Sequence, residues 1–208
     1  ARMEAEGLVN VRAQPVMVPR WVRGEEWLRL HAPQDQELPM LGLGMSIATP
    51  PTGVRAEVVA VSDFDALSAL GEEGVRGRIV LFNAPFTSYG ETVRYRTRGA
   101  SKAAALGAVA SLVRSITPES LQSPHTGTLG YDGDWRIPAA AVTLEDADRI
   151  QRWQDRGRKI EATLYMEAQL EEDAPSANVI GEVRGGARPD EIVVIGGHLD
   201  SWDVGQGA

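Results

Sequence analysis

Hydrophobic and polar residues alternate over much of the segment 9–22, near the start of the chain. Pro15 and Pro19 exclude the interior of a helix there, so the segment is predicted to be extended, with an edge position at each proline. A short strand over 26–30 and an apolar stretch over 40–47 follow. The Pro-Pro-Thr-Gly sequence at 50–53 then gives the clearest linker signal in the first half of the chain.

The middle of the chain alternates predicted strands with predicted helices. Apolar runs predict strands at 55–61, 77–83, 108–113 and 137–142, and a cleanly alternating run predicts one more at 160–166. Helices are predicted over 64–70 with Ser62 as the cap, over 100–106 ending at Gly107, and from the Thr143 cap to about Gly157 with Asp146 at the capping-box position. A polar loop over 115–134 is longer than most connections. This alternation indicates the α/β class.

The last third of the chain indicates a second sheet. The acidic, proline-containing linker 171–176 precedes two apolar runs, 177–183 and 191–196, which we interpret as a hairpin. We expect this hairpin to pair with the extended segment near the start of the chain. The simplest partition is therefore residues 1–37 and 173–208 in one parent α/β domain, interrupted by an inserted α+β domain over 38–172.

The chain stops in a glycine-rich turn where a crossover helix would normally begin, so we interpret it as a truncated piece of a longer protein. The parent sheet would then expose an apolar face, which favours self-association as a homo-oligomer or binding of the missing C-terminal half.

Composition excludes several classes of function. The 208 residues carry 21 Lys and Arg against 29 Asp and Glu, a net charge of −8, so nucleic acid is not an expected partner. No stretch approaches the roughly 18 apolar residues of a membrane span, and the first four residues do not resemble a signal peptide. Cysteine is absent, which excludes thiol nucleophiles, disulfides and thiolate metal sites.

Three histidines remain as candidates for chemistry. His31 fits a surface position and His125 a turn in the long loop, whereas His198 follows an apolar run and two glycines, at the expected carboxyl end of a buried strand. Asp200 lies two residues further on, on the same side of an extended chain. A carboxylate there can accept the second ring N–H of a metal-bound imidazole. A structural histidine–aspartate hydrogen bond is the alternative.

Two further groups of residues have alternative interpretations. Asp203 is either another carboxylate of the site or the cap of a turn. Arg94, Arg96 and Arg98 form the basic cluster of the chain, which is either a solvated face paired with the excess acid or an anion site.

The residues Gly-His-Leu-Asp-Ser-Trp-Asp-Val-Gly-Gln-Gly-Ala at 197–208 resemble the first metal-ligand motif of the zinc-dependent exopeptidase family of carboxypeptidase Q. The segment 175–180 resembles the strand that leads into that motif, and 90–101 resembles part of the family's protease-associated insert. Arg23–Glu26, 48–50 and 137–140 fit as well, so the resemblance covers nearly the whole chain.

This resemblance implies the N-terminal portion of a zinc exopeptidase that hydrolyses short peptides with water activated by two zinc ions. His198 would bind one zinc ion, and Asp200 would orient its imidazole in the catalytic site. The family's remaining ligands and its general-base glutamate follow the motif and are absent from this sequence, so the fragment alone is expected to be inactive. A secreted or periplasmic location is also implied. The alternative is a noncatalytic receptor or interaction module built on a protease-associated (PA) domain, and an intact downstream ligand set would exclude it.

Overall fold

The structure is a computed structural model that describes residues 2–188 and 190–205. The chain divides into two compact units. The smaller unit comprises Ala1–Arg20 with Glu172–Ala208, and the larger comprises Trp21–Glu171. Among the described residues, no helix is both long enough and apolar enough to cross a membrane.

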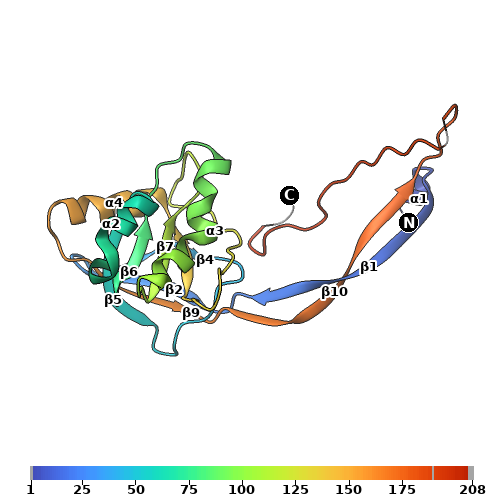
Figure 1. The fold of residues 1–208 in the computed structure, drawn as a ribbon. Helices are drawn as coiled ribbons and strands as arrows, with labels where there is room; N and C mark the ends of the chain where they lie inside the picture. The colour runs from blue at the N-terminus through green and yellow to red at the C-terminus, as the bar shows by residue number, and fades with distance from the viewer. Residues whose placement is uncertain (1, 189, 206–208) are drawn as a thin grey trace. The chain divides into compact units, whose positions relative to one another are not determined.

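The smaller unit is built on a two-stranded sheet. A short helix, α1 (Arg2–Ala5), precedes β1 (Val9–Val22), and β1 pairs with β10 (Gln169–Glu182). Figure 1 shows the two strands side by side with their arrows in opposite directions. Glu182 links them at one end, because its carboxylate accepts from Asn10 Nδ2 at 2.8 Å and from Arg12 at 2.9 Å. The predicted pairing of the extended segment near the start of the chain with the run 177–183 is therefore present, as β1 with β10.

The predicted hairpin between 177–183 and 191–196 is wrong. The strand β10 takes β1 as its partner, and residues 191–196 form no strand. The side chains of Ile192–Ile195 are exposed, with Ile195 at 93%. Two apolar runs separated by a turn-rich segment favour a local hairpin, but β10 forms its hydrogen bonds with a strand from the opposite end of the sequence.

The larger unit contains one mixed sheet of eight strands in the order β3-β2-β9-β5-β6-β7-β8-β4. Its strands are β2 (Glu26–Ala32), β3 (Gln36–Leu38), β4 (Met40–Gly42), β5 (Val54–Val61), β6 (Ile79–Phe82), β7 (Ala110–Arg114), β8 (Ala139–Val142) and β9 (Glu161–Met166). The four strands β5 to β8 run parallel, whereas β2, β9 and β4 pair antiparallel with their neighbours.

Three capped helices follow the parallel strands β5, β6 and β8 along the chain. In α2 (Phe64–Val75) the cap is Asp63, which accepts from the Ala66 N–H at 2.7 Å, not Ser62 as predicted. The helix α3 (Tyr89–Ala105) begins at the Ser88 cap, well before the predicted start at residue 100. In α4 (Leu144–Asp155) the predicted Thr143 cap is confirmed, because its hydroxyl accepts from the Asp146 N–H at 3.1 Å.

The hydrophobic core lies on both faces of this sheet. Because side chains alternate along a strand, Val58 and Ala60 of β5 belong to one core cluster and Val59 and Val61 to the other. The first cluster includes Ala147 and Ile150 of α4, whereas residues of α2 and α3 pack in the second. Helices therefore cover both faces of the sheet, and the predicted α/β class is confirmed.

The larger unit begins earlier than the inserted domain expected over 38–172. Its first residue is Trp21, and β2 lies inside the sheet between β3 and β9. Leu28 of β2 is opposite Leu38 on one side and Leu164 on the other, and its side chain is completely buried. The Pro50–Gly53 segment is a turn closed by the Gly53 N–H on Pro50 O at 2.8 Å. It leads into β5 and does not separate domains.

A half-buried polar cluster fixes the start of the larger unit. Arg23 donates to Glu26 at 2.9 Å and to Gly42 O at 2.8 Å, while Glu26 accepts from the Gly42 N–H at 3.0 Å. Trp21 Nε1 donates to Ser46 O at 2.9 Å. These bonds tie the segment after β1 to β4 and explain why the unit includes residues 21–37.

Candidate functional site

The structure brings His198 and Asp200 together. His198 Nδ1 lies 2.9 Å from Asp200 Oδ1, in the irregular segment that follows residue 196. The hydrogen bond from His198, followed by a backbone hydrogen bond and the imidazole charge, lowers the pKa of the Asp200 carboxyl. An aspartate that accepts from Nδ1 selects the tautomer in which Nε2 is the lone-pair nitrogen, the form that binds a metal ion.

The surroundings of this pair differ from the expected end of a buried strand. The His198 and Asp200 side chains are 81% and 83% exposed, and the residues before them form no strand. Asp203 lies in a turn closed by the Gly205 N–H on Trp202 O at 2.7 Å. Residues 206–208 of the motif lie outside the described residues. Within the described part of the chain, no group of three or more histidine and acidic side chains could hold a metal ion.

The other two histidines have partners in the larger unit. His31 Nε2 lies 2.8 Å from Thr163 Oγ1 across the β2–β9 pair, so His31 is half-buried on the sheet. His125 lies in the long loop, where its backbone N–H donates to Ser115 Oγ at 2.8 Å. Partial burial, together with the positive charge of Arg96, lowers the pKa of His125. Neither residue lies in a group of potential metal ligands among the residues described.

The basic cluster is not one solvated face, because its middle member points inward. Arg96 is 5% exposed and donates to Tyr89 Oη at 2.8 Å and to Thr126 O at 3.3 Å. Arg94 donates to Tyr95 Oη at 3.0 Å, whereas Arg98 is exposed. The full extent of α3 explains the difference, since Arg94 and Arg98 are four residues apart on one exposed face of the helix, whereas Arg96 lies on the opposite, buried side.

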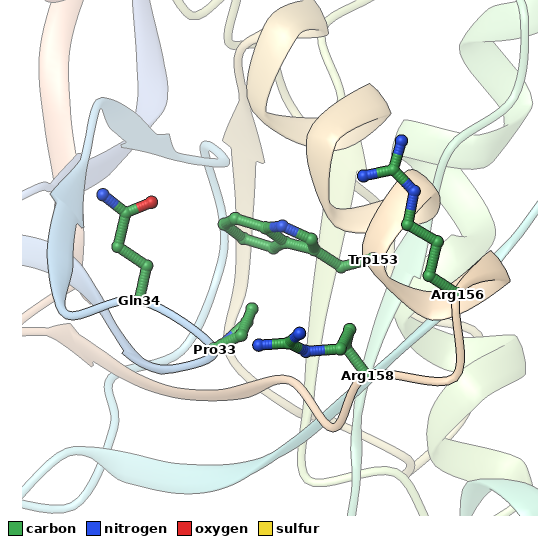
Figure 2. Close-up of a pocket in the computed structure, with 5 residues that line it drawn as sticks. All are labelled: Pro33, Gln34, Trp153, Arg156 and Arg158. Atoms are coloured by element: carbon green, nitrogen blue, oxygen red, sulfur yellow. The ribbon is translucent and has the colours of Figure 1, made fainter.

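A pocket that the sequence gave no reason to expect lies at the end of α4 (Figure 2). Its volume is about 420 Å³, and it is lined by Pro33, Gln34, Trp153, Arg156 and Arg158. An aromatic residue and two arginines near a helix end are common in sequences. Only the fold shows that they line one pocket together with the turn between β2 and β3.

Residues 54–150 match the PA domain family. The chain is 49% identical to carboxypeptidase Q from Xenopus laevis over 207 residues, which cover 99% of this chain and 44% of the relative. The crystal structure of a peptidase M28 precursor from Shewanella amazonensis superimposes with a TM-score of 0.92 at 35% identity, over 97% of this chain and 47% of that one.

A zinc aminopeptidase from Bacillus subtilis shares the fold, with a TM-score of 0.58 at 22% identity over 89% of this chain and 39% of that one. The chain therefore spans less than half the length of each of these three relatives.

Proposed function

Because this chain belongs to the carboxypeptidase Q family and contains a PA domain at residues 54–150, we propose that the whole protein is a zinc-dependent exopeptidase. It hydrolyses short peptides or dipeptides, and this chain supplies its N-terminal portion. The observation that carries the proposal is the identity of 49% over 99% of the chain, which includes the His198–Asp200 motif. The family suggests a secreted or periplasmic location.

His198 is the residue of this chain that would bind zinc. The geometry fits that role, because the Asp200 carboxylate at Nδ1 fixes the imidazole and leaves Nε2 for the metal ion. Zinc bound at such a site would polarise the substrate carbonyl and lower the pKa of a bound water molecule. Asp200 acts by orienting His198 and by keeping negative charge beside the ring. The hydrogen bond from His198 lowers the pKa of this carboxyl.

The remaining ligands would come from residues that follow this sequence. A catalytic zinc site needs about three protein ligands, so we expect the 208-residue chain alone to bind zinc weakly and to hydrolyse no peptide. The exposed side chains of Ile192–Ile195 support the missing C-terminal half as a partner, or self-association as a homo-oligomer, because such an apolar run rarely faces water.

Substitution of His198 in the whole protein tests the assignment. We expect His198→Ala to reduce both zinc content, measured by mass spectrometry, and turnover of a dipeptide panel. His31→Gln is the matched control, since His31 bonds to Thr163 and has no place in the proposed site. Equal zinc content in His198→Ala and wild type would contradict the role of His198.

Substitution of Asp200 separates orientation from metal binding. We expect Asp200→Asn to keep part of the zinc and to lower the rate by about 10- to 100-fold, the usual effect of losing a residue that orients a metal ligand. A whole protein that binds zinc at no site and cleaves none of the dipeptides would instead favour a noncatalytic PA-domain module. Chelator-sensitive hydrolysis by the 208-residue chain would contradict the proposal that the remaining zinc ligands follow this sequence.

A further inference from the structure

The pocket at the end of α4 has one wall from the β2–β3 turn and one from the helix end. Pro33 and Gln34 form the first wall, and Trp153, Arg156 and Arg158 form the second. Figure 2 shows the Arg158 side chain extending toward Pro33 below the indole of Trp153, whereas the Arg156 side chain projects away from Pro33. A volume of about 420 Å³ lies within the range of small-ligand sites.

The end of α4 places Arg158 beside Trp153. Gly157 has φ +67°, in the left-handed region that glycine adopts at helix ends, and the chain turns back there. The Arg158 N–H then donates to Trp153 O at 3.0 Å, and the Gly157 N–H donates to Gln154 O at 2.8 Å. These bonds hold the backbone of Arg158 next to Trp153.

The two walls are also joined to each other. Arg149 of α4 donates to Gln36 of β3 at 2.9 Å and to Asp146 at 2.7 Å, and its guanidinium lies 5.2 Å from the centre of the Trp153 ring. Arg149 thus holds the indole in place from one side. The pocket is therefore preformed, which lowers the entropic cost of binding a ligand.

The charge around the pocket opposes that of the whole chain. Residues 149–159 contain five basic residues and one acidic residue, in a chain whose net charge is −8. Asp155, the acidic one, accepts from Gln151 at 2.9 Å. Among the described residues, neither Arg156 nor Arg158 forms an ion pair. Their two charges exceed the roughly half negative charge at the carboxyl end of a helix.

We propose that this pocket binds a short acidic peptide segment. A carboxylate of the segment would pair with Arg158, whose planar guanidinium suits two parallel hydrogen bonds to one carboxylate. An apolar side chain next to it would lie against Trp153 and Pro33, and the Gln34 amide could bond to the peptide backbone. The pocket is formed within the larger unit alone, so this inference does not depend on the proposed peptidase activity.

Nuclear magnetic resonance of the 208-residue chain tests the proposal. The probe is N-acetyl-Glu-Phe-Glu-amide, and the readout is the indole N–H signal of Trp153, assigned with a Trp153→Phe variant. We expect the signal to shift and to saturate with increasing peptide. In the variant Arg156→Gln with Arg158→Gln, we expect about tenfold weaker binding, because the ion pair at Arg158 and the positive charge of Arg156 beside the pocket are both lost.

Two controls make the result specific. Arg152→Gln removes an exposed arginine of the same helix that does not line the pocket, and it should leave the affinity unchanged within about twofold, the scale of a weak exposed charge effect. The neutral peptide N-acetyl-Gln-Phe-Gln-amide should bind much more weakly than the acidic one. Equal binding of the two peptides, an equal loss in Arg152→Gln, or no shift up to the solubility limit would overturn the proposal. Acetate or inorganic phosphate that binds as tightly as the peptide would reduce the site to one for simple anions and also overturn it.

Discussion

Replacement of Leu28 by alanine tests whether β2 is an integral strand of the larger unit. Leu28 is completely buried, lies opposite Leu38 and Leu164, and belongs to the core cluster that α4 covers. Truncation of a buried leucine to alanine costs about 2–5 kcal/mol, depending on how well the cavity collapses. For a unit of this size, each kcal/mol lowers the melting temperature by about 2–4 °C, so we expect a decrease of about 4–20 °C.

The assay combines calorimetry with hydrogen exchange. Because β2 shares one sheet with β6 and β7, the amides of Val80 and Leu112 should exchange faster in Leu28→Ala. Met17→Ala on β1 is the control, since Met17 is 57% exposed and its loss should change stability by less than about 0.5 kcal/mol. A melting temperature equal to that of the wild type, with unchanged exchange in β6 and β7, would refute the placement of β2 in this sheet.

Three further substitutions test the packing and the polar groups of the larger unit. A Cβ at Gly99 would lie 2.8 Å from Phe82 Cε2 in the buried ring cluster, so Gly99→Ala should lower the free energy of unfolding in urea by about 1–3 kcal/mol. Gly90→Ala in the same helix is the control, because a Cβ there meets no atom within 4 Å and should not destabilise the protein. The hydrogen bond from the Ala66 N–H lowers the pKa of Asp63. The contribution of the Asp63 carboxylate to stability is therefore present above the unfolded pKa of about 3.9 and is lost as the pH falls through the lower folded value. Asp63→Asn should flatten the profile of stability against pH in that acid range. Burial lowers the pKa of His125, so the unfolded chain takes up a proton at this residue more readily than the folded chain does. Stability therefore decreases as the pH falls below about 6.5. His125→Gln should remove this part of the pH dependence, and an unchanged profile of stability against pH would contradict the argument.

Local patterns predicted many of the secondary-structure elements, because their signals lie within a few residues. The Thr143 cap bonds to the Asp146 N–H three residues later, and the alternation over 9–22 corresponds to β1. The sequence pattern gave wrong domain limits where the pairing strand lies far away along the chain. The pairing of Leu28 with Leu164 joins distant parts of the chain, and no local signal separates a strand of the inserted domain from a strand of the flank.

The candidate site shows the same contrast. The contact between His198 and Asp200 follows from their spacing of two residues, and the structure contains it. Their burial depended on a strand over 191–196, which does not form, so the expected surroundings were wrong. The pocket beside Trp153 combines residues of α4 with a turn more than a hundred residues earlier, a combination that no short motif could indicate.

The direct measurement of the central claim is X-ray diffraction at the zinc absorption edge, on crystals of the whole protein grown with zinc. We expect an anomalous peak about 2.0–2.1 Å from His198 Nε2, with Asp200 hydrogen-bonded to Nδ1 of the same ring. The assignment of His198 as a zinc ligand would be contradicted if zinc bound elsewhere in the protein while His198 contacted Asp200 and no metal ion.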